Sequence, residues 1–142
     1  MYPRNKLFKW KVINLRTCIL CDASDESENH LWFECGYIKE VVEVVFNWLG
    51  IHHRFGDVRS WMTWFRDDTR HASLIFQSKL LGFVALVYFT WKSRNMALFR
   101  NVLWTPKECA CLVIRECRER IISKGTSRNR IERNWCQFLE RH

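Results

Sequence analysis

The sequence predicts a mostly α-helical protein in which a small cysteine- and histidine-rich knuckle precedes a bundle of about four to five helices. Three observations support this prediction. Three cysteines and a histidine crowd into residues 18–35, apolar side chains recur at helical spacing in later segments, and one of those segments is apolar on nearly every side. Apolar residues make up 48% of the 142 residues and charged residues 27%, a composition that can bury a core.

The knuckle has the spacing of a structural zinc site. Its pattern is Cys18-x2-Cys21-x8-His30-x4-Cys35, in which a C-x2-C turn brings two thiolates within reach of one ion and the later pair completes a tetrahedral shell. Thiolates and an imidazole suit Zn²⁺, and four protein ligands leave no open position for a catalytic water. We therefore expect one structural Zn²⁺ per chain. The alternative is three buried cysteines and a surface histidine.

Cysteine usage also indicates the compartment. Seven cysteines are an odd number, and their spacing does not match a disulfide framework of secreted proteins. The N-terminus shows no secretory signal, because it runs straight into a charged amphipathic stretch. We expect an intracellular, non-secreted protein of the nucleus or cytoplasm, in which clustered cysteines bind metal rather than form disulfides.

Apolar spacing predicts helices before and after the knuckle. Residues 7–12 indicate a short helix or a helix-to-loop segment, and residues 37–50 a longer helix that ends at Gly50. The apolar stripe of the longer helix comprises Ile38, Val41, Val42, Val45, Phe46 and Leu49. Residues 51–57 indicate a loop. The short helix that follows, within residues 58–68, has on one face Val58, Trp61, Met62 and Phe65.

A long helix is predicted over residues 72–100. It is apolar nearly all round at residues 80–91, a pattern typical of a helix at the centre of a bundle. This run has twelve residues between Lys79 and Lys92, whereas a membrane span needs roughly 20. We therefore expect a buried helix and no membrane partner.

The next helix has a marked start. Thr105 is the expected N-cap, Pro106 the first helical residue, and Glu108 the acidic partner three residues after the cap. Glu116 and Arg120 are four residues apart and can pair on its polar face. Its apolar stripe comprises Ala110, Val113, Ile114, Cys117 and Ile121.

The end of the chain completes the bundle. Gly125 is expected to end the preceding helix, and a last helix is expected over residues 128–139. We expect a zinc-binding module at residues 1–50 and a helical region at residues 51–142 that packs on it within one continuous domain.

Positive charge lies outside the knuckle. The formal net charge is +8 and the isoelectric point about 9.4, which favours anionic partners. Residues 1–17 hold five bases and no acid, residues 18–50 have a balance of −6, and residues 51–142 have a balance of +9. Contacts with an anionic partner are therefore expected from the basic segments on either side of the acidic knuckle.

Two motifs resemble one known family. The segments "CILC" and "ENHLWFEC", with the helix after them, resemble the zinc-binding domain that follows the reverse transcriptase in plant non-LTR (LINE-type) retrotransposons. The family's Cys-x-x-Cys and His-Leu-x-Phe-x-Cys patterns are matched by the four expected zinc ligands. Its Trp-x-x-Arg-Asn pattern is matched by Trp91, Arg94 and Asn95, followed by Phe99. The upstream "PRNKLFKWKV" resembles the family's "PTRDRL" segment.

The sequence also departs from the family pattern. Asp22 stands where the family usually has glycine, and aspartate can adopt the left-handed turn needed there. Gly36 stands where the family usually has proline, and neither change removes a ligand. The family's aromatic-rich helix upstream of the knuckle has no counterpart, so we expect an N-terminally truncated, stand-alone copy of the domain.

The resemblance implies a non-enzymatic zinc-binding module, derived from a reverse transcriptase, that helps to bind RNA or DNA. Basic segments would hold phosphates with weak sequence preference, and exposed rings such as Trp10 would stack on bases. The candidate contacts are Lys9, Lys11, Arg16, Lys124, Arg128 and Arg130. Two alternatives stay open: a zinc-stabilised module that docks a polymerase domain or another protein, and an orphaned remnant without a selected role.

Other chemical signals are weaker. The "WFRDD" segment superficially resembles a polymerase palm turn, but a palm needs a third carboxylate and far more chain, so Asp67 and Asp68 are expected at a helix end or in a loop. Three histidines lack a partner spacing and are expected in loops: His52, His53 and His71. Four cysteines are expected as core or partly exposed thiols: Cys109, Cys111, Cys117 and Cys136.

Overall fold

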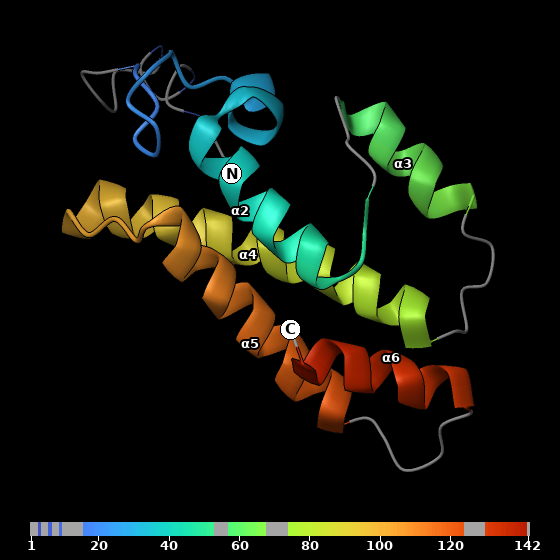
Figure 1. Cartoon of the computed structure of the whole chain (residues 1–142). Coiled ribbons are helices and arrows are strands. Elements are labelled where there is room, and N and C mark those ends of the chain that lie inside the picture. Colours follow the sequence, from blue (N-terminus) through green and yellow to red (C-terminus); the bar gives the residue numbers. More distant parts are fainter. Residues whose placement is uncertain are drawn as a thin grey trace.

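The computed structural model describes residues 3, 6, 9, 16–52, 57–67, 74–123 and 130–141. These ranges are mostly α-helical and hold a Cys3His cluster near their N-terminal end, so the predicted fold class is confirmed. The elements are the π-helical turn η1 (His30–Glu34) and the helices α2 (Gly36–Trp48), α3 (Val58–Asp67), α4 (Leu74–Arg100), α5 (Pro106–Ser123) and α6 (Arg130–Arg141). In Figure 1, α4 passes behind α2 and α5, and the cysteine-rich segment lies near the C-terminal end of α4.

α2 carries the predicted stripe, and the predicted glycine closes the helix two residues after its last helical residue. Gly50 has a φ of 62° and donates its N–H to the Asn47 carbonyl at 3.1 Å, while the N–H of Ile51 donates to the Phe46 carbonyl at 2.8 Å. These two bonds form a Schellman closure, which requires a left-handed residue at this position. Val42 is half-buried, and the rest of the stripe is buried: Ile38, Val41, Val45, Phe46 and Leu49.

Both α2 and α4 pack against α5, which therefore lies at the junction of the helical body. Two hydrogen bonds of buried side chains also join the helices. The hydroxyls of Tyr37 and Ser93 are 2.9 Å apart and join α2 to α4, and the Trp48 indole N–H donates to the Leu139 carbonyl at 3.1 Å and joins α2 to α6. The fully buried apolar residues of this body include Val41, Val45, Leu86 and Val113.

The end of α2 and the middle of α4 meet at Gly82. A β-carbon at this position would stand 2.4 Å from Cδ1 of Leu49, which is itself fully buried. A larger residue at this position would therefore force the buried Leu49 side chain to shift.

α4 is confirmed as one long helix, but the prediction that its apolar run is enclosed on all sides is wrong. Gly82, Ala85, Leu86, Phe89 and Thr90 face the core and are buried. The opposite side of the helix is exposed by between 42% and 55% at Leu80, Val84, Tyr88 and Trp91. The run is apolar all round because the outward side of α4 also carries apolar and aromatic residues, and this outward side has no cover among the described residues.

By length and composition, α4 is also long and apolar enough to cross a membrane, a test that core helices of soluble proteins pass as well. Here α4 packs against α2 and α5 and carries a buried arginine, Arg94, that is held by an ion pair. One side of α4 therefore packs in the core of the helical body, and the expectation of no membrane partner stays a prediction.

The start of α5 is the predicted capping box. The N–H of Thr105 donates to Oε2 of Glu108 at 2.7 Å, and the N–H of Glu108 donates to Oγ1 of Thr105 at 3.2 Å. Pro106 is the first helical residue, and Glu116 pairs with Arg120 as expected. The stripe is confirmed too: Ile114 is half-buried, and the buried members are Ala110, Val113, Cys117 and Ile121.

The remaining elements are confirmed with small shifts in their limits. α6 ends at Arg141, two residues beyond the predicted end, and α3 forms within the predicted range. Gly125 and most of residues 7–12 lie outside the described residues, as do the side chains of Val58, Trp61, Met62 and Phe65. The division of the chain at residue 50 stays a prediction.

Candidate metal centre

The four predicted ligands come together in one cluster. Their ligand atoms all lie within 4.8 Å of one another. Cys18 Sγ is 3.9 Å from Cys35 Sγ, and Cys21 Sγ is 3.3 Å from Nε2 of His30. In a tetrahedral shell with bonds of about 2.0–2.3 Å, neighbouring ligand atoms lie roughly 3.5–3.8 Å apart. The residues present therefore fit a single tetrahedral metal ion.

A tight turn presents the first two ligands. Asp22 has a φ of 51°, and its N–H donates to the Cys18 carbonyl at 2.9 Å. The N–H of Cys18 donates to the Ser24 carbonyl at 2.8 Å, and Thr17 bridges to Asp25. The expectation that aspartate adopts the left-handed conformation here is confirmed, and the sulfurs of Cys18 and Cys21 both belong to the cluster.

A π-helical turn presents the other two ligands. The N–H of Cys35 donates to the carbonyl of His30 at 2.7 Å, an i to i+5 bond that defines η1. In an α-helix, residues five apart point in different directions, because each residue turns the chain by about 100°. The wider π turn places Cys35 above His30, so both can face the same ion.

Contacts and burial shift the pKa values of two of the thiols, Cys18 and Cys35. The contact between the two thiols raises the pKa of Cys18, and burial raises it further. The same contact lowers the pKa of Cys35, against the effect of burial and with help from the backbone N–H of Ile38. Cys35 is also the N-cap of α2, where the helix dipole favours an anionic sulfur.

Polar residues around His30 fix its position. Its backbone N–H donates to Oγ of Ser27 at 2.9 Å. Its Nδ1 lies 4.0 Å from Oε2 of Glu34, and Glu34 accepts a hydrogen bond from Asn29 at 2.5 Å. At 4.0 Å the Glu34 carboxylate is too far for a hydrogen bond, but it lies on the Nδ1 side of the ring and leaves Nε2 for the metal.

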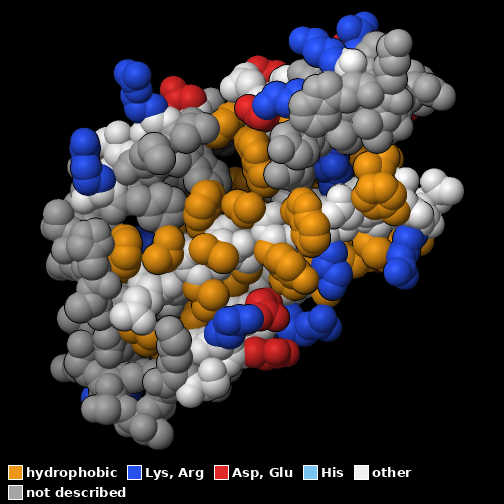
Figure 2. Space-filling view, turned by 180° about the vertical axis from the view of Figure 1, so that it is seen from behind, with side chains coloured by type: hydrophobic (Ala, Val, Ile, Leu, Met, Phe, Trp, Pro, Cys, Tyr) orange, Lys and Arg blue, Asp and Glu red, His pale blue; other side chains and the backbone are white. Residues whose placement is uncertain are grey.

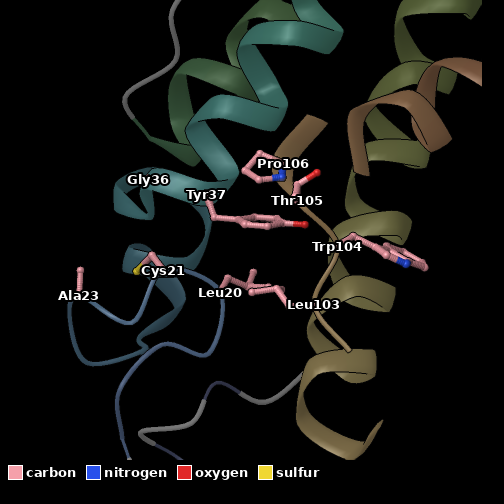
Figure 3. Close-up of a pocket in the computed structure, with 9 residues that line it drawn as sticks. All are labelled: Leu20, Cys21, Ala23, Gly36, Tyr37, Leu103, Trp104, Thr105 and Pro106. Carbon is pink, nitrogen blue, oxygen red and sulfur yellow. The ribbon is translucent and has the colours of Figure 1, made fainter. Parts of the chain in front are cut away.

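Three of the four ligand side chains are shielded from solvent. Cys18, Cys35 and His30 are buried, and Cys21 is half-buried. Cys21 lies on the wall of a pocket of about 550 Å³ between the knuckle and the segment before α5 (Figure 3). Leu20 and Tyr37 point toward Leu103 and Thr105 across this pocket. Cys21 is therefore the ligand that a metal ion or a chelator would reach first.

A buried ion pair joins the knuckle to α4. Glu26 lies between the second and third ligands in the sequence and is 0% exposed, and Arg94 of α4 is 2% exposed. Nε of Arg94 donates to both carboxylate oxygens, at 3.0 and 3.1 Å, and Nη2 donates to Oε1 at 2.5 Å. This multidentate pairing fixes the direction as well as the distance between the two elements.

Sequence reasoning missed this pair. In the sequence Glu26 is one of five acids between Cys18 and Cys35, and Arg94 is part of the Trp-x-x-Arg-Asn pattern. The signal lay in α4, because an arginine within a mostly apolar helix needs a buried anionic partner. The acidic knuckle is the part of the chain with negative balance, so it was the natural source of that partner.

The chain was compared with known proteins. No family model, curated protein or solved structure matches it. The resemblance to the retrotransposon domain therefore stays a prediction that depends on the motifs alone.

The predicted nucleic-acid contacts are described only in part. Lys9 and Arg16 are exposed, and Arg16 pairs with Asp25 at 3.5 Å. Arg130 begins α6. The other predicted contacts lie outside the described residues: Lys11, Lys124 and Arg128. Trp10 lies outside them as well.

The remaining candidates behave as ordinary core and surface residues. Burial raises the pKa of Cys109 to about 11 and that of Cys117 to about 12. Cys136 is buried and Cys111 exposed. Asp67 is the last residue of α3, and His52 is exposed. Asp68, His53 and His71 lie outside the described residues. Within the part of the chain that the structure describes, only the knuckle gathers three or more metal-ligating side chains.

Proposed function

We propose that the chain is a non-enzymatic, zinc-stabilised module that binds nucleic acid and derives from the zinc-binding domain of a plant non-LTR reverse transcriptase. The Cys3His ligand set supports zinc, because thiolates and imidazole suit this ion better than hard divalent cations. When bound, the ion supplies a cross-link between ligands distant in sequence. Four protein ligands leave no position for a substrate, which supports a structural role.

The coupling of knuckle and helical body is the observation that carries this proposal. Glu26, inside the metal-binding segment, pairs with Arg94 in the Trp-x-x-Arg-Asn segment of α4. The two motifs on which the family resemblance depends are thus parts of one structural unit. That gives a physical reason for their occurrence together and supports a common origin with the family.

Zinc is tested by metal analysis of protein purified without added metal. We expect about one zinc per chain, because a closed Cys3His site holds zinc tightly. A preparation that is folded and carries only a trace of metal would contradict the proposal.

Nucleic-acid binding is supported by the charge distribution. The chain carries +8, and the positive excess lies outside the acidic knuckle. Affinity for single-stranded RNA or DNA should fall steeply between low and moderate salt, because phosphate contacts release counterions. Equal affinity at both salt concentrations, or no binding at low salt, would contradict the proposal.

A zinc-stabilised protein-interaction module is the second candidate. The exposed aliphatic side chains on and after α4 favour it, because contiguous apolar surface marks contact sites. Salt-insensitive association with a protein, in the absence of nucleic-acid binding, would favour this second candidate.

A further inference from the structure

The outward side of α4 combines exposed rings with cations. Tyr88 is 49% exposed, Trp91 42% and Phe99 76%. We name the aromatic–basic face by its five residues: Tyr88, Trp91, Lys92, Phe99 and Arg100. Figure 2, seen from behind Figure 1, shows hydrophobic side chains gathered across this side of the molecule, with Lys and Arg side chains and some Asp and Glu side chains along its border.

The rings on this face are arranged as a platform. Tyr88 and Trp91 are about one helical turn apart, with ring centroids 6.0 Å apart and planes inclined by 37°. The ammonium group of Lys92 lies 5.9 Å from the Tyr88 ring, and at the same distance from the rings of Phe89 and Trp104. A cation is thus held within the aromatic cluster.

The stretch of sequence that contains α4 has bases but no acid. Residues 69–107 contain six bases and no aspartate or glutamate. Arg94 is neutralised by Glu26 in the interior, and Lys79 lies over the Trp64 ring of α3, whereas Lys92 is half-buried and Arg100 is exposed on the outward side. The outward side of α4 therefore offers exposed rings beside two cations, Lys92 and Arg100, on a helix that has no acid of its own.

We propose that the aromatic–basic face binds single-stranded nucleic acid, with bases stacked on Tyr88 and Trp91 and phosphates held by Lys92 and Arg100. This inference rests on the proposed function and gives it a location that differs from the basic segments predicted from sequence. Single strands expose both faces of their bases, and stacking on aromatic side chains tolerates any sequence. The same face supplies cations for the backbone.

Charge decides between this occupant and a second copy of the chain. Two copies meeting through this face would bring Lys92 and Arg100 of each against those of the other, and α4 has no carboxylate to compensate them. A polyanion with planar bases complements both features of the face.

The test measures binding of labelled oligo-dT and oligo-U of about 12 nucleotides, a length within the usual site size, by fluorescence anisotropy at two salt concentrations. The double variant Tyr88→Leu/Trp91→Leu keeps apolar bulk and helix propensity but removes both rings. We expect its affinity to fall by at least roughly tenfold. Zinc content and thermal stability should be unchanged, which separates loss of stacking from unfolding.

Lys92→Ala and Lys39→Ala form a matched pair, because each removes one positive charge. Lys39 is exposed on α2, away from the aromatic–basic face. Lys92→Ala should weaken binding and lower the salt dependence by about one unit of slope, whereas Lys39→Ala should leave both nearly unchanged.

Each outcome has one consequence. If the wild-type chain binds with salt sensitivity but the Leu/Leu variant and Lys92→Ala bind equally well, this location is overturned and the proposed function stands. If the wild-type chain binds neither oligonucleotide, both fail. A concentration-dependent dimer that Val84→Asp abolishes, without loss of nucleic-acid binding, would assign the face to self-association and overturn the inference.

Discussion

The knuckle and the helical body are stabilised in different ways. The knuckle is a short acidic segment with turns, one isolated bridge and a π-helical turn, and its few buried apolar residues include Leu20 and Leu31. The body consists of long helices packed through continuous apolar stripes on α2, α4 and α5. A segment of the first kind buries too little surface to fold alone, whereas the second kind carries its own core.

This difference separates the roles of the two regions. The knuckle holds the metal-ligand set and has a negative balance, so it is suited to fixing structure rather than to binding phosphate. The body has the exposed rings and the excess of bases. Glu26 and Arg94 connect the two, and each of the following predictions tests one side of the comparison or the connection.

The largest effect is expected from Cys21→Ser. Loss of one thiolate should release the metal and unfold the knuckle, because metal binding contributes about 10–16 kcal/mol in zinc-finger peptides. Helical circular dichroism should decrease only in part, since the body keeps its own core. Cys111→Ser is the matched control, because Cys111 is exposed and outside the cluster. Equal zinc content and thermal stability in both variants would refute the metal site.

Arg94→Met removes the ion pair between the knuckle and α4. It leaves the Glu26 carboxylate buried without its partner, and removing one member of a buried pair costs about 3–5 kcal/mol of unfolding free energy. The double variant Glu26→Leu/Arg94→Met removes both charges and should recover most of the loss. Denaturant titration measures both. If the double variant is as unstable as the sum of two single ones, the pair is not the connection we describe.

Gly82→Ala tests the packing of the body. The added methyl group meets the buried Leu49, and overpacking of about 1–3 kcal/mol exceeds a gain of about 1 kcal/mol in helix propensity. We expect a net loss of stability with unchanged zinc content. Gly36→Ala is the control, because a β-carbon there meets nothing within 4 Å and stability should change little. A stabilised Gly82→Ala variant would contradict the close approach.

The smallest effect is expected at the start of α5. The N–H and hydroxyl groups of Thr105 lower the pKa of Glu108 in the folded state. This carboxylate therefore contributes stability above its unfolded pKa, and the contribution is lost as the pH falls through the folded pKa. The difference in melting temperature between wild type and Glu108→Gln should thus shrink between about pH 6 and pH 3. A constant difference would contradict the capping role.

Local signals in the sequence predicted most of the fold and the ligand set. Gly50 closes α2, the Thr105 capping box starts α5, and the spacing of Cys18 to Cys35 gives the cluster, because each depends on neighbouring residues. Hydrophobic periodicity also located the buried side of α2 and α5. Such features need no knowledge of distant contacts.

Features that depend on distant contacts could not be predicted in this way. The sequence predicts that all sides of α4 are buried, because an apolar run does not show which neighbouring elements cover each side. The Glu26–Arg94 pair spans 68 residues of sequence, and the π-helical turn at His30 is not distinguished by composition from an α-helical one. The two most informative features for function thus came from the packing.

Hydrogen exchange of the zinc-loaded chain before and after treatment with a chelator tests the central claim most directly. The account predicts that amides of residues 16–35 lose their protection when zinc is removed, while those of α5 stay protected, because the knuckle depends on metal and the body on apolar packing. Equal protection of residues 16–35 with and without zinc, or simultaneous loss of protection in α5, would contradict it.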